Sequence, residues 1–557
     1  PEQILALTFT RKAAKEMEQR ISTLLGDLGI KEVRVATFHG FCLDILRNEK
    51  DKTDLPTDFM LCSEVDAGNI AKEILSGSGG GKRLARGFQK ALPDMKTASV
   101  LGPREEVFDH DFHPLFEKYQ RRLRGLGMLD LDDLEVETLR LLLNYPEVSL
   151  TYSKRFPWVF VDEYQDTNHV QVELLKTLVH ADSGIICAIG DPDQAIYGFR
   201  GADVKNFHRF KDDFPGTREI ALTRNYRSSK IILEASAAIM GKEKPLQCES
   251  PGKAPVSLAH CRTEPEEAEM IVEQVERLIG GTTYFSLDSG RVASHEGELS
   301  LGFGDIGVLF RLNAQGEALE EALDRSGIPF VRSGQAPLIN RYPVNILWRF
   351  FQTLQSPDNP YYSQRYQAVL AVTGLGTKAA IEGFQAPISL PDLVDQAITF
   401  HELDCSPRES EEAIRHLRRL AAGFEDMKTF LDMLSLERGI DHAVLAGDRV
   451  ALMSLHAAKG LEWPVVFITG CEDRLLPCSL FGTRDDEEER RLFYVGMTRA
   501  HSRLILSHVG RRTINGRVLP MKPSPFLDDI PGDLCIPLDR REWKRKGKAH
   551  KQLDLFK

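Results

Sequence analysis

The segment FVDEYQDTN (160–168) leads from an apolar strand directly into two adjacent carboxylates, Asp162 and Glu163. In a nucleotide hydrolase, the first acid of such a pair holds Mg²⁺, usually through water, and the second orients and deprotonates the attacking water. An isolated Asp-Glu pair more often marks two solvated acids at a strand end. The longer string DEYQD favours the hydrolase interpretation.

Strand-like apolar runs on both sides of this segment alternate with helical patterns. The runs are ILALTF (4–9), WVFVDE (158–163), IICAIGD (185–191), DIGVLFR (305–311) and PVVFITG (464–470). Such alternation predicts parallel sheets wrapped by helices. Residues 45–124 and 346–440 are mostly helical in period. The sequence therefore predicts an α/β fold with two parallel-sheet domains, each interrupted by a mainly helical insertion.

A chain of 557 residues is long enough for several domains. We expect a first domain from 1–44 and 125–228 with the insertion 45–124, a second domain from 229–345 and 441–528 with the insertion 346–440, and a flexible basic tail from 529–557.

Composition constrains the function and the compartment. The net charge of −11 argues weakly against nucleic-acid binding, because phosphate neutralisation needs Lys and Arg. Charge can still be local, and residues 540–551 are strongly basic. The nine cysteines form no CxxC pair, so neither a zinc site nor a disulfide framework is predicted. We find no membrane span or signal peptide and expect a reducing cytoplasm.

A second strand end, AIGDPDQAIYGFRGAD (188–203), combines amide, aromatic and cationic side chains. Gln194 is placed to contact a terminal phosphate and sense its loss. Tyr197 and Phe199 beside Arg200 suit stacking on single-stranded nucleic acid. The alternative is a tight turn whose two aromatics face the core.

Two arginines downstream are candidates to stabilise charge on a transferred phosphoryl group. Arg227 lies in LTRNYRSS (222–229), after Tyr226, which can stack on a base. Arg499 lies near the end of EEERRLFYVGMTRAHSRLIL (487–506). The alternatives are a surface arginine at 227 and, for Arg499, a salt bridge to the acidic run at 485–489.

These strings, together with LHAAKGLEWPVVF (455–467), resemble in order the motifs of the UvrD/Rep/PcrA group of superfamily 1 DNA helicases. LTFTRKAAKEMEQRI (7–21) and VATFHGFCLDIL (35–46) look like the early DNA-contacting motifs of that family, and MLDLDDL (128–134) also matches. The resemblance covers roughly residues 1–530. It implies two RecA-like motor domains that close on ATP and Mg²⁺ and move 3′ to 5′ along single-stranded DNA, with DNA junctions as substrates.

The resemblance also implies a role for each matching residue. Asp162 would be the Mg²⁺ ligand, Glu163 the hydrolytic base, Gln194 the γ-phosphate contact, and Arg227 and Arg499 the arginine fingers. Tyr226, Gly460 and Glu462 would bind the nucleotide. The residues along the single-stranded DNA path would be Thr10, Thr37, Phe38, His39, Tyr197, Phe199, Arg200 and His456. Phe199 stands where the family often has Trp.

The sequence departs from the family in lacking the glycine-rich phosphate loop, GxxGxGK[ST]. SGSGGGKR (76–83) is no substitute, because it follows a helix rather than a strand. Nucleotide affinity should collapse without the loop's N–H groups and lysine. We expect an N-terminally truncated helicase that is inactive alone. The alternative is a non-hydrolysing DNA-binding or clamp-recruited module, although retention of all five catalytic candidates favours the helicase. A helicase–nuclease of the RecB/AddA type is disfavoured, because no acid-rich nuclease segment follows residue 510.

The last residues, KQLDLFK (551–557), look like the short peptide that bacterial sliding clamps bind in an apolar pocket. Leu553, Leu555 and Phe556 would be the anchors and Gln552 a polar latch, on a basic flexible tether. The alternative is a frayed terminus with a few apolar residues.

Overall fold

The computed structural model describes residues 2–26, 33–76, 82–102, 112–179, 184–242, 245–250, 254–280, 301–333, 337–373, 389–436, 447–480, 485–514 and 516–538. The chain forms two compact units. The first unit contains residues 1–191, 197–217 and 335–441, and the second contains 192–196, 218–334 and 442–557. Among the described residues, no helix combines the length and the hydrophobicity that crossing a bilayer requires.

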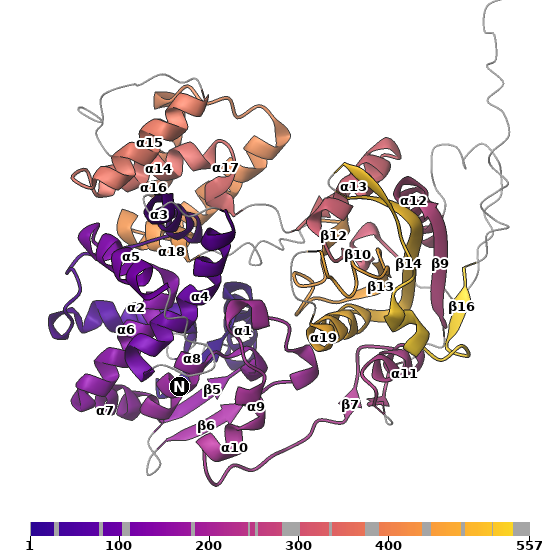
Figure 1. Cartoon of the computed structure of the whole chain (residues 1–557), viewed down its shortest axis with the longest axis horizontal. Coiled ribbons are helices and arrows are strands. Elements are labelled where there is room, and N and C mark those ends of the chain that lie inside the picture. Colours follow the sequence, from indigo (N-terminus) through magenta and orange to yellow (C-terminus); the bar gives the residue numbers. More distant parts are fainter. Residues whose placement is uncertain are drawn as a thin grey trace, which may run out of the picture. The chain divides into compact units, whose positions relative to one another are not determined.

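The first unit is built on a four-stranded parallel sheet in the order β2-β1-β5-β6. Strands β5 and β6 are labelled in Figure 1. Its strands are β1 (Ile4–Thr8), β2 (Arg34–Thr37), β5 (Trp158–Val161) and β6 (Ile185–Ala188). Because all four strands run the same way, their carboxyl ends meet at one edge of the sheet, which is where ligands bind in open α/β sheets. The loop with Asp162 and Glu163 follows β5 at this edge.

Helices cover one face of this sheet and only part of the other. The covered face packs against helices α2 (Phe38–Asn48), α6 (Leu131–Asn144), α7 (Pro146–Arg155) and α8 (His169–Leu178). Helix α1 (Arg11–Leu25) packs on the opposite face over β1 and β2. The neighbouring side chains of β5 and β6 are open to solvent, with Trp158 43% and Ile185 51% exposed. The sheet thus presents an apolar surface at the β6 edge.

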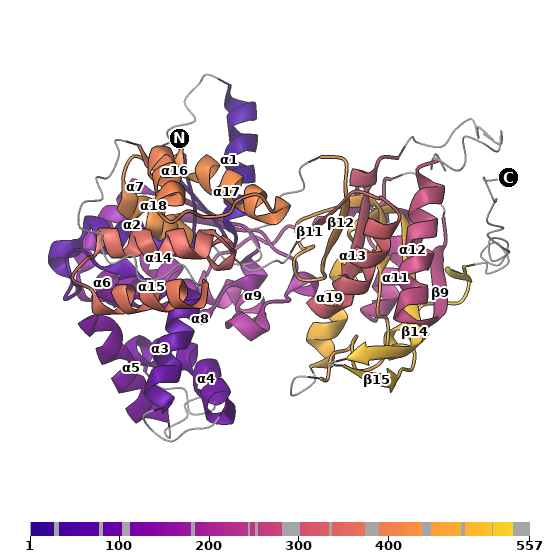
Figure 2. The ribbon, with the colours of Figure 1, turned by 90° about the horizontal axis from the view of Figure 1, so that it is seen from above.

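The helical parts of the first unit come from two distant segments. Helices α3 (Glu64–Ser76), α4 (Lys82–Leu101) and α5 (His113–Gly125), with strands β3 (Met60–Leu61) and β4 (Met128–Leu129), form the first segment. The second segment contains α14 (Val344–Gln355), α15 (Pro360–Thr373), α16 (Leu390–Phe400), α17 (Arg408–Ala421) and α18 (Met427–Ser435). Helices α14 and α15 run side by side (Figures 1 and 2).

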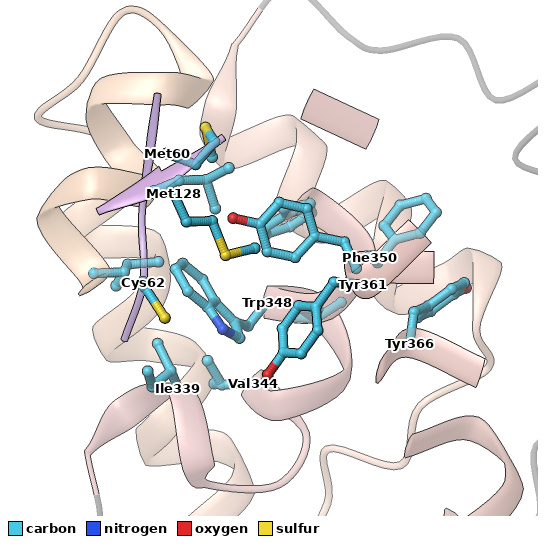
Figure 3. Close-up of a cluster of buried hydrophobic side chains, with 14 of the residues drawn as sticks. Met60, Cys62, Met128, Ile339, Val344, Trp348, Phe350, Tyr361 and Tyr366 are labelled. Carbon is cyan, nitrogen blue, oxygen red and sulfur yellow. The ribbon is translucent and has the colours of Figure 1, made fainter. Parts of the chain in front are cut away.

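The two helical segments share one hydrophobic core (Figure 3). Met60, Cys62 and Met128 of the first segment pack with residues of the second that include Trp348 and Phe350, and all five side chains are at most 5% exposed. Burial of this extent contributes roughly 1.5–3 kcal/mol for each large apolar side chain. The segment 337–436 is therefore packed on the segment 58–129 as firmly as parts of one domain.

A buried ion pair also joins the two segments. Arg349 of α14 donates two hydrogen bonds to Asp66 of α3, at 2.9 and 2.8 Å, and Tyr361 donates a third to the same carboxylate at 2.9 Å. Arg47 of α2 also pairs with Asp432 of α18, and so joins the second segment to a helix of the sheet. Since unpaired buried charge is costly, these contacts fix which faces of the two segments meet.

The second unit is built on an eight-stranded sheet in the order β11-β12-β10-β13-β14-β9-β16, with β15 antiparallel to β14. The strands are β9 (Val256–Thr263), β10 (Ile306–Phe310), β11 (Phe330–Arg332), β12 (Val450–Ser454), β13 (Trp463–Ile468), β14 (Ala500–Ile514), β15 (Arg517–Pro520) and β16 (Cys535–Pro537). Helices α12 (Glu264–Leu278) and α13 (Gly316–Arg325) lie on one side of the sheet, and α11 (Lys230–Ile239) and α19 (Asp486–Met497) on the other (Figure 1).

The α/β class and the parallel sheets expected from the sequence are confirmed. The domain boundaries expected from the sequence remain predictions, and the compact units divide the chain differently in three places. Residues 192–196 and 218–228 belong to the second unit, and the segment expected as the insertion of the second domain packs in the first. The tail from 539 onward, with its clamp-binding candidate, lies outside the described residues, as do residues 77–81 of SGSGGGKR.

Candidate functional site

The acidic loop is held at the carboxyl end of β5 by backbone hydrogen bonds. The Asp162 N–H donates to Leu7 O at 2.9 Å, and the Tyr164 N–H donates to Ile189 O at 2.9 Å. Glu163 has a φ of 54°, a left-handed conformation that costs a non-glycine residue about 1–3 kcal/mol. Such strain persists where the surroundings enforce it, and it marks Glu163 as a functional candidate.

Gln165 ties the acidic loop to the end of β6. Its Nε2 donates to Glu163, and its Oε1 accepts a hydrogen bond from the Asp191 N–H at 3.0 Å. Gly190 permits this approach, because a Cβ at that position would lie 2.5 Å from Gln165 Oε1 and 2.9 Å from the Phe207 ring. The acidic loop and residues 188–191 of the second strand-end motif are therefore connected within the first unit.

Asp162 and Glu163 fit a magnesium site. Mg²⁺ is usually held by one or two protein carboxylates together with water and substrate phosphates. Among the described residues, no three His, Cys, Asp or Glu side chains gather closely enough to hold a metal by themselves. The two adjacent carboxylates suit a cation that also binds water and substrate phosphates.

The expected DNA-path residues near β1 and β2 lie at helix starts. Thr10 caps α1 by accepting from the Ala13 N–H at 3.1 Å, and Thr37 caps α2 by accepting from the Gly40 N–H at 3.1 Å. Helix N-termini attract phosphate, which suits a DNA backbone. Phe38, by contrast, is 4% exposed and belongs to the hydrophobic core, so its ring offers no surface for a base. The His39 side chain is 14% exposed and lies 3.4 Å from Glu135.

The aromatic turn at 197–200 presents one ring to solvent. Tyr197 is 4% exposed and stacks on Phe9, with ring centroids 4.9 Å apart. Phe199 is 64% exposed, and the Arg200 guanidinium lies 5.6 Å from its centroid. The core-facing alternative therefore fits Tyr197, and Phe199 is the ring that a base can reach. Phe9 is a support that the sequence reasoning missed, although it lies within a recognised motif.

The MLDLDDL segment has a structural role in its described contacts. Asp130 and Asp133 cap the start of α6, and the buried Lys96 pairs with both carboxylates. Tyr119 donates to Asp130 at 2.7 Å. Burial, reinforced by Asp130, raises the pKa of Tyr119 well above its ordinary value. These acids stabilise the joint between the sheet and the first helical segment.

Cations surround Gln194 within the second unit. Lys459 Nζ donates to Gln194 O at 2.7 Å, Arg491 Nε donates to Ala195 O at 2.8 Å, and Arg499 Nη2 lies 3.5 Å from Gln194 Oε1. Lys459 and Arg491 were not identified from the sequence. Lys459 stands within the recognised LHAAKG string, which was the available signal, whereas no spacing rule singles out Arg491.

Arg499 is held in place by the end of α19. Its side chain is 1% exposed, and it donates to Val495 O at 2.9 Å and to Leu461 O at 3.3 Å. Glu489 of the acidic run pairs with Arg311 at 2.6 Å. A further hydrogen bond, from Arg499 Nη2 to Thr498 Oγ1 at 3.2 Å, helps to fix the orientation of the guanidinium.

Arg227 and Glu462, both expected at the nucleotide, pair with each other at 2.5 Å. Burial opposes ionisation of Glu462, but Arg227, His501 and Arg499 outweigh it and lower the pKa of that carboxyl. Tyr226 beside them is 73% exposed, so its ring is open to a ligand. Gly460 forms the turn after His456 with a φ of 78°.

Comparison with known proteins matches the chain to two domain families. Residues 1–215 match the UvrD/REP helicase N-terminal domain, and residues 220–402 and 390–511 match the UvrD-like helicase C-terminal domain. The ATP-dependent DNA helicase PcrA of Staphylococcus epidermidis is 30% identical over 96% of this chain and 80% of its own length. UvrD1 of Mycobacterium tuberculosis is 30% identical over 98% and 80%, and PcrA of Bacillus subtilis is 28% identical over 99% and 82%.

Proposed function

Because the chain belongs to the UvrD/REP helicase family, we propose that it is the motor of an ATP-dependent DNA helicase that moves 3′ to 5′ on single-stranded DNA. One observation carries the proposal. The buried Arg499 and the Lys459 ammonium both approach Gln194, the residue expected at the terminal phosphate. Cations fixed in this way stabilise the charge that develops in phosphoryl transfer.

The acidic loop supplies the complementary chemistry. Glu163 is the base that accepts a proton from the attacking water, and Gln165 holds its carboxylate against the end of β6. Asp162 is the ligand for Mg²⁺, which when bound neutralises charge on the phosphates. On the DNA side, the N-termini of α1 and α2 face phosphates, and the exposed Phe199 stacks on a base.

The phosphate loop is the part of the machinery that this sequence does not contain, and we propose that the chain does not hydrolyse ATP without it. Among the described strands, β6 lies at the edge of its sheet, and Trp158, Phe160 and Ile185 are exposed, which supports a place for a phosphate-loop element there. A further parallel strand beside β6, followed by a helix over these side chains, would complete the sheet and bury its apolar surface.

Compartment and clamp recruitment are subsidiary proposals. All nine cysteines are free, which is compatible with a reducing cytoplasm. For the C-terminal peptide, Leu555→Ala with Phe556→Ala should abolish capture by a bacterial sliding clamp and leave DNA binding unchanged. Equal capture of the variant and the unaltered chain would rule out clamp binding through this peptide.

A direct test compares nucleic-acid substrates on the 557-residue chain. Fluorescence anisotropy with dye-labelled oligothymidylate should show binding at least about tenfold tighter than to blunt duplex DNA, because unstacked bases can reach Phe199. Equal affinity for the oligonucleotide, the duplex and heparin would indicate only a polyanion-binding surface and would count against the motor.

A further inference from the structure

Glu135 of α6 is a buried carboxylate that the proposed chemistry does not use. Its side chain is 3% exposed. Helix α6, which carries it, packs against α2, which begins in the expected DNA path, and against α8, which follows the acidic loop. A buried carboxylate needs polar partners, and the identity of those partners shows what it positions.

Three side chains from two other elements meet this carboxylate. Gln171 Nε2 donates to Glu135 Oε1 at 2.6 Å, and Asn168 Nδ2 donates to Oε2 at 2.7 Å. His39 Nε2, at the start of α2, lies 3.4 Å from Oε1. Both carboxylate oxygens are therefore engaged, and one of them is shared between α8 and the histidine.

Asn168 and Gln171 are the capping box of α8. Asn168 Oδ1 accepts from the Gln171 N–H at 2.9 Å, and Gln171 Oε1 accepts from the Asn168 N–H at 3.1 Å. Each amide thus uses its oxygen for the helix cap and its nitrogen for Glu135. The cap begins at Asn168, shortly after the turn Tyr164–Asp166 that follows Glu163, so Glu135 contacts the residues in which the acidic loop ends.

The same carboxylate orients the ring of His39. A carboxylate beside Nε2 fixes the rotation of an imidazole and favours a proton on that nitrogen. The ring is carried by the helix start that Thr37 caps, in the segment expected to contact DNA. Glu135 therefore stands between the DNA-contacting segment and the catalytic loop.

We propose that Glu135 is a positioning residue for single-stranded DNA binding, which sets His39 and the α8 cap in one arrangement so that DNA contact and the acidic loop are adjusted together. The inference rests on the proposed function, because it requires that His39 contacts DNA. The proposal gives a role in DNA binding to a residue that is not among those expected along the single-stranded DNA path.

The test is a double-variant comparison in the 557-residue chain with dye-labelled oligothymidylate at fixed salt. Glu135→Gln places an amide nitrogen against donors, and it should weaken binding about five- to tenfold, as should His39→Ala. The combined variant should bind no more weakly than His39→Ala alone, because both changes remove one coupled contact. Glu137→Gln is the matched control on the same helix, since Glu137 pairs with Arg124 and Arg140 instead, and it should stay within about twofold.

Each outcome has a separate meaning. Absence of binding by the unaltered chain would overturn the proposed function itself. Binding that is insensitive to Glu135→Gln or to His39→Ala, or losses that multiply in the combined variant, would overturn only the positioning role. Should Glu135→Gln fail to give a cooperative thermal transition, Glu135→Asp replaces it. That variant keeps the charge and the acceptors but withdraws the carboxylate from His39, and the same coupling with His39→Ala is expected.

Discussion

Replacing Arg349 with methionine should strongly destabilise the first unit. The Arg349 side chain is 9% exposed and that of Asp66 is 1% exposed, so the pair is shielded from water. In Arg349→Met, Asp66 keeps only the hydroxyl donors of Ser63 at 2.8 Å and Tyr361 at 2.9 Å among its described side-chain partners. Removing one partner of a buried pair costs about 3–5 kcal/mol, because the remaining charge is left uncompensated.

Two further variants identify the cause of that loss. Asp66→Asn combined with Arg349→Met removes the buried charge as well, so more than half of the lost stability should return. Asp58→Asn breaks an exposed pair with Lys428 across the same two helical segments, and it should cost less than about 1 kcal/mol. Urea unfolding followed by circular dichroism measures the free energy of unfolding for all four proteins. If Arg349→Met costs no more than Asp58→Asn, the buried Arg349–Asp66 pair does not stabilise the contact between the two helical segments.

The pH dependence and the DNA surface give two more predictions. Burial raises the pKa of Asp432 from the ordinary 3.8 to about 6 although Arg47 opposes the shift, so the folded state holds a proton that the unfolded state has lost. The stability that this group contributes is present below about pH 4 and is lost as pH rises through about 6, by roughly 3 kcal/mol in all. Asp432→Asn should therefore flatten the dependence of the free energy of unfolding on pH. An unchanged dependence would contradict the raised pKa of Asp432. Phe199→Ala should weaken oligothymidylate binding by about 1–3 kcal/mol, the usual loss for one stacked base, whereas Val372→Ala, at another exposed apolar side chain, should not change it.

The sheets were predictable because each of these strands coincides with a short apolar run in the sequence. The expected strand 185–191 is β6 at Ile185–Ala188, and 305–311 is β10 at Ile306–Phe310. Residues that directly follow such runs, including Asp162, necessarily lie at the carboxyl edge of a parallel sheet. Local pattern was therefore enough to place the acidic loop, although it gave no sign of the left-handed conformation of Glu163.

The partners of the helical segments were not predictable from local pattern. The helix containing Trp348 is visibly amphipathic in sequence, which indicates that one face is buried but not against what. Its neighbours Met60 and Met128 lie more than two hundred residues earlier and join it only through long-range packing. The same limit applies to Phe38 and Tyr197, since an aromatic ring in a motif can equally face the core or a base.

The central proposal is that this chain carries catalytic residues of a helicase motor and cannot hydrolyse ATP without a phosphate loop, which its sequence does not contain. The most direct test is single-strand-stimulated phosphate release by the 557-residue chain, alone and fused at its N-terminus to the phosphate-loop segment of a PcrA relative, each with a Glu163→Gln counterpart. We expect no stimulated hydrolysis by the chain alone, and stimulated hydrolysis by the fusion that Glu163→Gln abolishes. Stimulated hydrolysis by the chain alone, lost on Glu163→Gln, would mean that another of its segments binds the phosphates and would contradict the account.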